Sequence, residues 1–297
     1  MKKDKKTPKG DNETEITKTE KRYNGTEITI LYANANSLTG KQASLKSAAE
    51  TAEATVLAIT ETMGKPPIIQ GYKWINEKTR THKGGGGVAI AVREDLLHRT
   101  QQPQNIETRN EEATWIQIRT NQNNLLYIGT YYGKQESDKE ETIEEEFTTL
   151  TTQINTLKTR GQVILTGDFN AKLEIIKEGT KIQDESRNGK HLRKMMRNTN
   201  MEAANLRSDA KGVWTRQHRQ NASQRSVIDY ILTPTNNGPP IKETITDEEG
   251  ALTLKDKGHS DHNTITIKIN SKAPKEVKKP ENGNSQTKQA GQNTTNR

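Results

Sequence analysis

Short runs of apolar and β-branched residues recur along the chain, and they constrain its fold more than any other feature. Each run is bounded by Gly, Asn, Asp or Pro, which is typical of strands that end in turns. The runs lie at 27–33, 55–60, 88–92, 114–119, 125–131, 162–166, 227–232 and 264–269. So many short strands predict sheets that pack against each other.

Three other stretches carry apolar residues at helical spacing, at 41–54, 139–158 and 189–200. In the second, apolar residues recur every three or four positions from Ile143 to Leu157. Strands with a few interspersed helices predict an α/β fold in which two packed sheets are covered by helices on the outside.

The two ends of the chain differ from its middle. Hydrophobic residues make up only 29% of the sequence, and residues 1–25 and 271–297 contain almost none of them. Such segments cannot bury enough surface to offset their ordering entropy. We therefore expect a disordered basic tail at 1–25, one folded domain at 26–270 with a single core, and a disordered polar tail at 271–297.

Charge and cysteine content narrow the classes of function. The formal net charge of +8 favours a nucleic acid or an anionic membrane surface as partner. The chain has no cysteine, which excludes thiolate chemistry and disulfides. It also has no long apolar run and no apolar leader, so we expect no membrane association. The lysine-rich start is a weak nuclear address, and we expect a nuclear location.

The strongest local motif is Gly167-Asp168-Phe169-Asn170, directly after an apolar strand. This order places a carboxylate at the rim of a sheet, with an amide two residues later. A carboxylate can orient or deprotonate a water molecule, and an amide can hold a phosphate oxygen without adding charge. An ordinary turn explains this tetrapeptide equally well.

Two further motifs point to an acid–base pair. Asp229 lies inside an otherwise apolar strand, where a buried carboxylate needs a partner. Ser260-Asp261-His262 precedes the last strand and offers a histidine for that purpose. A polar loop at 260–262 and a strand that turns Asp229 toward water are the plainer alternatives.

Asn34, Asn36 and Glu61 also follow predicted strands, although each is weak evidence alone. If all these strands end at one rim, several carboxylates meet there and repel one another. A divalent metal ion would relieve this repulsion, and oxygen ligands suit Mg²⁺.

Taken in order from Asn34 to His262, these residues resemble the endonuclease/exonuclease/phosphatase superfamily. The shared order is Asn-x-Asn, Glu, a tyrosine after a strand, Gly-Asp-Phe-Asn, Asp in a strand and Ser-Asp-His. The resemblance implies a DNase I-like fold, a four-layer α/β-sandwich of two mixed sheets flanked by helices. It also implies a catalytic site at the rim of that sandwich.

Within the superfamily, two segments are similar to the AP-endonuclease-like domain of LINE-type (non-LTR) retrotransposons. They are the glycine run and strand at 84–92 and the segment Asn34-Ala35-Asn36-Ser37-Leu38. Asn36 stands where repair AP endonucleases carry aspartate, which argues against a repair enzyme. The chain has no Asp-Asp dipeptide, so no reverse transcriptase signature follows, and we expect an endonuclease domain by itself.

The resemblance implies a role for each motif residue. The metal ligands would be Asn36, Glu61 and Asp261, with Mg²⁺ as the ion and Mn²⁺ as an alternative. The catalytic group would comprise Asn34, Tyr131, Asp168, Asn170, Asp229 and His262. Asp168 would position or activate the attacking water, and His262, oriented by Asp229, would contact the scissile phosphate. Tyr131 would contact the phosphate or the leaving group.

The implied reaction is nicking of double-stranded DNA to a 3′-hydroxyl. A phosphatase of the same superfamily and an inactive nucleic-acid-binding relic are the alternatives. Between Thr215 and Ser226 the chain is polar and basic and is flanked by strands, which predicts a hairpin tip. Its DNA-binding candidates are Arg216, His218, Arg219 and Arg225, which suit a narrow minor groove. An ordinary solvated loop is the alternative there.

Overall fold

The structure is a computed structural model that describes residues 27–78, 86–106, 112–120, 124–218, 221, 223–252, 254 and 260–270. Both predicted tails, part of the glycine run before residue 86 and the candidate Arg219 lie outside the described residues. Within the described ranges, none of the helices is long and apolar enough to cross a membrane.

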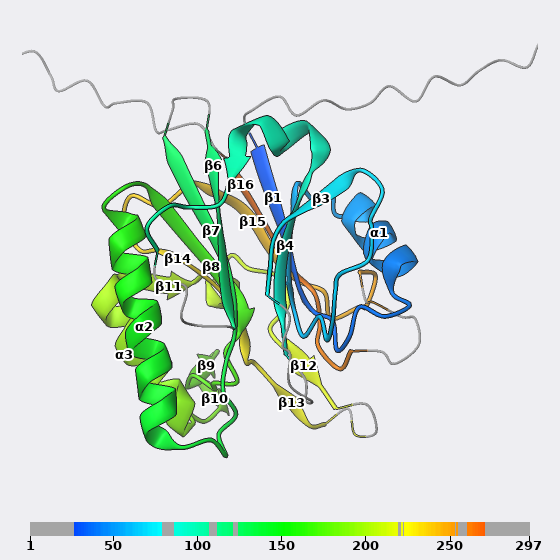
Figure 1. The fold of residues 1–297 in the computed structure, drawn as a ribbon. Coiled ribbons are helices and arrows are strands. Elements are labelled where there is room, and N and C mark those ends of the chain that lie inside the picture. The colour runs from blue at the N-terminus through cyan, green and yellow to red at the C-terminus, as the bar shows by residue number, and fades with distance from the viewer. Residues whose placement is uncertain are drawn as a thin grey trace, which may run out of the picture.

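Two six-stranded mixed sheets pack face to face (Figure 1). In spatial order, the first sheet contains β15 (Ile241–Thr246), β16 (Ile265–Asn270), β1 (Glu27–Asn34), β2 (Val56–Thr60), β4 (Val88–Arg93) and β3 (Tyr72–Lys78). The second contains β11 (Met201–Ala203), β14 (Asp229–Pro234), β8 (Gln162–Asp168), β7 (Leu125–Tyr132), β6 (Ala113–Arg119) and β5 (Thr100–Gln101). Neighbouring strands are antiparallel except for the pairs β1–β2 and β7–β8.

Helices cover the outer faces of both sheets, as Figure 1 shows. Helix α1 (Gln42–Thr51) packs on the first sheet, and α2 (Glu140–Lys158) and α3 (Arg187–Thr199) lie on the second. Aliphatic side chains of both sheets fill the space between them. The four layers confirm the predicted α/β-sandwich.

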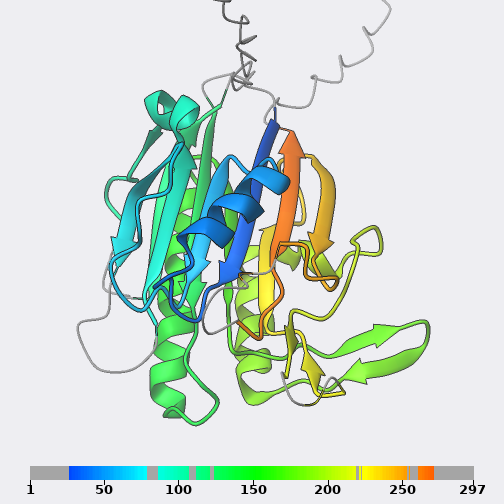
Figure 2. The same cartoon turned by 90° about the vertical axis from the view of Figure 1, so that its right-hand side faces the viewer.

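The remaining elements are small. Two 3₁₀ turns span Glu94–Arg99 and Ala204–Leu206. Two hairpins, β9 (Ile175–Lys177) with β10 (Thr180–Gln183) and β12 (Arg216–Gln217) with β13 (Arg225–Ser226), lie at the same end of the sandwich (Figure 2). The predicted hairpin between Thr215 and Ser226 is therefore present.

The apolar runs correspond to strands with boundaries that shift by one or two residues. The run at 227–232, for example, becomes a strand that begins at Asp229. Two strands of the first sheet, β3 and β15, were not predicted. Both lie at sheet edges and carry exposed or half-buried polar residues, as in Tyr72–Lys78, so an apolar pattern is weak there.

Candidate active site

The candidate site lies where strands of both sheets end together. In the first sheet, β1 and β2 run parallel, and their register places Asn34 beside Thr60, the residue before Glu61. In the second sheet, β7 and β8 run parallel and place Tyr132 beside Asp168. The antiparallel strand β14 begins with Asp229 directly opposite Asp168. Strand pairing therefore brings these side chains to one rim.

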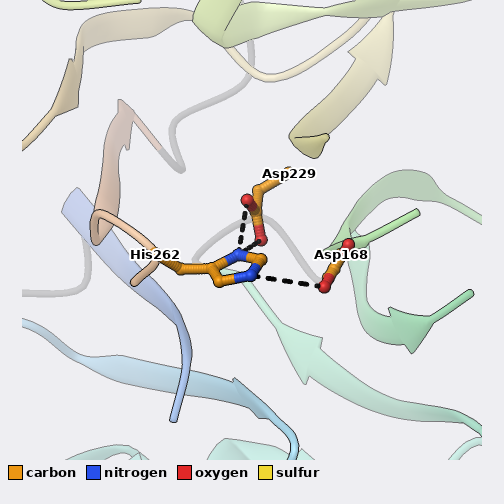
Figure 3. A group of neighbouring side chains, drawn as sticks. All are labelled: Asp168, Asp229 and His262. Atoms are coloured by element: carbon orange, nitrogen blue, oxygen red, sulfur yellow. Dashed lines mark hydrogen bonds and ion pairs between the residues drawn. The ribbon is translucent and has the colours of Figure 1, made fainter. Parts of the chain in front are cut away.

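His262 sits between the two aspartates of the second sheet (Figure 3). Its Nδ1 lies 2.9 and 3.0 Å from the two carboxylate oxygens of Asp229. Its Nε2 points toward Asp168 and lies 3.9 Å from Oδ2 of that residue. The Tyr32 hydroxyl, from β1, donates to Asp229 at 2.8 Å. All four side chains are buried, so Asp229 has the partners that a buried carboxylate requires.

Burial and neighbouring charges shift the pKa values of Asp168 and His262. Burial and the Asp229 carboxylate raise the pKa of Asp168 to about 7, although the nearby imidazole lowers it. For His262, burial lowers the pKa, but the surrounding carboxylates, with Asp229 foremost, raise it to about 9. The imidazole is therefore a cation at neutral pH. A carboxylate with a pKa near neutrality suits proton transfer.

Asn34 connects the two sheets at the rim. Its amide nitrogen donates to Oε1 of Glu61 and to Oδ2 of Asp168, at 3.0 Å in each case. Its amide oxygen accepts the backbone N–H of Asn36 at 3.0 Å. One buried side chain thus holds the candidate metal ligand and the candidate base in a fixed relation.

Three residues of the site have left-handed backbone conformations. The φ angles are 42° for Asn36, 51° for Glu61 and 47° for Asn170. Asparagine tolerates this region, but for glutamate it costs on the order of 1–2 kcal/mol. The Ser37 N–H donates to the Glu61 carbonyl at 2.8 Å, which fixes this conformation. Strain of this kind persists only where the surrounding structure imposes it.

The buried Lys41 ammonium also holds this rim. Its Nζ donates to the backbone carbonyls of Ala35 and Asn36. It therefore fixes the turn that carries Asn36, with no exposed charge. Nothing in the sequence pattern indicated this role for Lys41.

The oxygen atoms at and around Glu61 suit the coordination of a divalent cation. The Glu61 carboxylate accepts a hydrogen bond from Asn34, and its charge also acts on Tyr132 and Asp168. Carboxylate and amide oxygens are the ligands that Mg²⁺ prefers. Ligand atoms of Asp168, Asp229 and His262 also lie within 4.8 Å of one another. Because the imidazole is already hydrogen-bonded to Asp229, we interpret those three as a proton-transfer group.

Asn170 lies beside Asp168 on the loop after β8. Its N–H donates to Oδ1 of Asp168 at 2.9 Å, and its side-chain amide donates to the Gly133 carbonyl at 2.8 Å. Gly133 must be glycine here, since a Cβ would lie 2.4 Å from the Phe169 carbonyl oxygen. The loop after β7 therefore packs directly on the loop that carries Asn170.

The structure does not bring Tyr131 to the site, which corrects the sequence-based assignment. Its hydroxyl donates to Glu146 of α2 at 2.8 Å, and its ring packs on Phe147 and Phe169 in the outer layer. Tyr132, the next residue, pairs with Asp168 at the rim, where the Glu61 charge acts on its hydroxyl. Burial, Glu61 and Asp168 raise the pKa of Tyr132. Successive residues of a strand face opposite sides, so a one-residue error selects the wrong face.

The β12–β13 hairpin is fastened to the segment that carries His262. Nε of Arg216 donates to Asp261 at 2.8 Å, and the Gln217 N–H donates to the Asp261 carbonyl at 2.8 Å. The other carboxylate oxygen of Asp261 lies 3.7 Å from Nε2 of His262. Although burial raises the pKa of Asp261, its neighbours His262 and Arg216 lower it overall. A candidate metal ligand and a candidate DNA contact thus form an ion pair.

The other hairpin candidates lie farther along the same turn. The His218 N–H donates to the Gln224 carbonyl at 2.9 Å, and Arg225 pairs with Gln217 across the hairpin. Beside the hairpin, a hollow of about 250 Å³ is lined in part by Asn170, Lys172, Arg216 and Ser226. Its wall carries two cationic side chains, of which Arg216 is paired with Asp261, and the carboxylate of Glu136.

Two facing mixed sheets with helices outside and this acidic, imidazole-containing rim form an α/β-sandwich, and comparisons with known proteins agree with this fold. Residues 126–266 match the family described as "Endonuclease-reverse transcriptase". Over those residues the chain is similar to this family. No curated protein matches the sequence.

Solved structures share the fold over most of the chain. The endonuclease domain of TRAS1, a telomere-specific non-LTR retrotransposon, is 19% identical, with 82% of this chain and 98% of that chain covered and a TM-score of 0.58. An AP endonuclease from Leishmania major is 12% identical, with coverages of 82% and 88% and a TM-score of 0.65. A 3′-5′ exonuclease from Neisseria meningitidis is 17% identical, with coverages of 82% and 99% and a TM-score of 0.60. Identities this low establish the fold alone.

Proposed function

We propose that this protein is a divalent-metal-dependent endonuclease that nicks double-stranded DNA and leaves a 3′-hydroxyl, as in target-site cleavage by a non-LTR retrotransposon. The observation that carries the proposal is the buried imidazole of His262 between Asp229 and Asp168, at the same rim as Glu61 and Asn34. This arrangement combines a cation for a phosphate oxygen with a carboxylate for a water molecule.

Each side chain has a chemical task in this proposal. Asp168 accepts a hydrogen bond from the attacking water and takes its proton, while Asn34 and the Asn170 N–H hold the carboxylate in place. His262 donates to a non-bridging phosphate oxygen and stabilises the negative charge that develops there. Asp229 keeps the imidazole protonated and oriented.

The proposed ion is Mg²⁺, with Mn²⁺ as a substitute. Glu61 would hold it, with Asn36 and Asp261 as the further ligands expected from the resemblance. A bound divalent ion would offset the charge of the surrounding carboxylates and stabilise charge on the phosphate. For Asp261 to bind the ion, its carboxylate must either release Arg216 or contact the ion and Arg216 at the same time.

Double-stranded DNA is the proposed substrate. The net charge of +8 and the cationic side chains beside the site support a polyanionic partner. One structural neighbour, a 3′ phosphatase from Neisseria, was solved with a product DNA hairpin. We also propose a nuclear location, which a fluorescent fusion of the full chain would test.

A supercoiled-plasmid assay tests the proposed function. Wild-type protein should convert the plasmid to open circles with Mg²⁺ or Mn²⁺, and excess EDTA should stop the reaction. A DNA polymerase should extend the nicked ends without prior phosphatase treatment, because they carry 3′-hydroxyls. Asp168→Asn, prepared in the same way, controls for a contaminating nuclease.

Two results would overturn the proposal. Release of inorganic phosphate from 3′-phosphorylated DNA or inositol phosphates, without nicking, would identify a phosphatase. A gel shift with DNA and no cleavage under any divalent ion would identify a binding protein that lacks the chemistry.

A further inference from the structure

The N-terminus of helix α3 packs directly against the loop that follows Asp168. The Ser186 N–H donates to the Lys172 carbonyl at 3.0 Å, and the Ser186 hydroxyl accepts the Lys172 N–H at 3.1 Å. A Cβ at Gly189 would lie only 1.9 Å from the Lys172 carbonyl oxygen. This approach is therefore open to glycine alone, and it brings the first turn of α3 against the loop.

Asn188, in that first turn, joins two loops of the site. Its side-chain nitrogen donates to the carbonyls of Lys134 and Asn170, at 2.9 and 3.1 Å. Its backbone N–H donates to the Glu136 carboxylate at 2.9 Å. A carboxylate at a helix N-terminus is favourable because of the helix dipole. The residue itself is 1% exposed, and its three hydrogen bonds are partly buried.

The orientation of the Asn188 amide shows what it contributes. Both partners of its nitrogen are carbonyl oxygens, so only a donor fits that side. Among the described residues, its Oδ1 has no hydrogen-bond partner although it is buried. Leaving a buried acceptor unpaired costs about 1–3 kcal/mol.

The two loops that Asn188 joins lie on either side of Asp168. One carries Asn170, whose N–H holds Oδ1 of Asp168. The other begins at Tyr132 and Gly133, and the Gly133 N–H donates to the Asp168 carbonyl at 2.7 Å. The Asn170 side chain closes the ring by donating to the Gly133 carbonyl.

We propose that Asn188 is a positioning residue for the reaction, which fixes the loops of Asn170 and Tyr132 and through them the carboxylate of Asp168. The inference rests on the proposed function for its rate measurement, but the loop order itself can be measured without any activity. Gly189 contributes to the same positioning, because it permits the close approach of helix α3 to the loop after Asp168.

The test compares Asn188→Asp and Gly189→Ala with matched controls. Asn188→Asp keeps the shape but turns an oxygen toward two carbonyl oxygens, and Gly189→Ala pushes the helix from the loop. The control for the first is Gln153→Glu, since Gln153 is another buried amide, which accepts from a tryptophan in the outer layer. The control for the second is Gly161→Ala, where a Cβ would lie 2.2 Å from a backbone oxygen at the far end of β8.

We expect kcat for plasmid nicking to fall about 10- to 100-fold in both test variants, with KM nearly unchanged, because misplaced groups lose transition-state contacts. Both controls should lower the melting temperature without lowering kcat of the folded protein.

Amide hydrogen exchange supplies the readout that needs no activity. The N–H groups of Asn170 and Gly133 should exchange faster in both test variants and remain protected in both controls. Unchanged protection of these two amides overturns the proposal, whether or not the wild type cuts DNA. If the wild type nicks plasmid and Asn188→Asp nicks at the same kcat, the proposal also fails, while the proposed function stands.

Discussion

Tyr131 and Tyr132 offer the sharpest test of the site, because they are neighbours of the same type on opposite faces of β7. The Tyr132 hydroxyl lies where the Glu61 charge acts on it, whereas the Tyr131 hydroxyl donates to Glu146 of α2. Replacing each by phenylalanine removes one hydroxyl and leaves the ring in place. The two changes should therefore separate effects on the reaction from effects on stability.

The magnitude follows from the kind of hydrogen bond that is lost. A hydrogen bond to a charged group contributes about 1.5–3 kcal/mol, and each 1.36 kcal/mol of barrier is about a tenfold change in rate. If the Tyr132 hydroxyl donates to the Glu61 carboxylate in the transition state, Tyr132→Phe should slow nicking by roughly 10- to 100-fold. Tyr131→Phe leaves Glu146 with Lys134, 3.3 Å away, and should lower the free energy of unfolding instead.

The assay is single-turnover nicking of a supercoiled plasmid at saturating Mg²⁺, together with urea denaturation of both variants. Wild-type nicking by Tyr132→Phe with slow nicking by Tyr131→Phe would show that the face assignment is wrong. An equal loss of nicking rate in both variants would mean that the strand moves as a whole. The argument that the two tyrosines act separately on opposite faces of β7 would then fail.

Three further predictions concern the rest of the rim. Glu61→Gln should abolish Mg²⁺-dependent nicking while thermal melting stays cooperative, and nicking at the wild-type Mg²⁺ dependence would remove Glu61 from the metal site. His262→Ala should lower the rate by about 10²- to 10⁴-fold and Asp229→Asn by less, since Asp229 acts only through the ring, which it orients and keeps protonated; single-turnover rates in the reverse order would contradict that role. Lys41→Met should lower both stability and kcat, because the buried Ala35 carbonyl loses its donor at about 1–3 kcal/mol and the partly buried Asn36 carbonyl loses its donor as well. Urea denaturation and nicking with no change in either would leave Lys41 without a role.

Much of the fold could be predicted because buried strands and helices carry apolar residues in regular local patterns. In β1 all residues but the first are buried, and such a run is visible without a structure. Edge strands are different. In β15, buried residues are interrupted by half-buried or exposed ones such as Lys242 and Glu243, and only pairing with β16 makes this segment a strand.

The site could be predicted in part for a related reason. Asp168 and His262 belong to short motifs that carry chemistry by themselves, and the structure brings both to one rim. The tyrosine was misplaced by one position, because two aromatic residues end the same strand and sequence order does not show which faces the rim. Lys41 and Asn188 had no motif, since their roles depend on backbone carbonyls that are reached only in the folded chain.

The same contacts that define the site also close this end of the sandwich. Tyr32 reaches Asp229 across 197 positions of sequence, and Asn34 reaches Asp168 across 134. Both donors come from the first sheet and both acceptors from the second. Asp168 and Asp229 lie directly opposite each other in their strands, where like charges repel. The imidazole cation and these cross-sheet donors offset that repulsion, so the catalytic arrangement can form only when the two sheets pack.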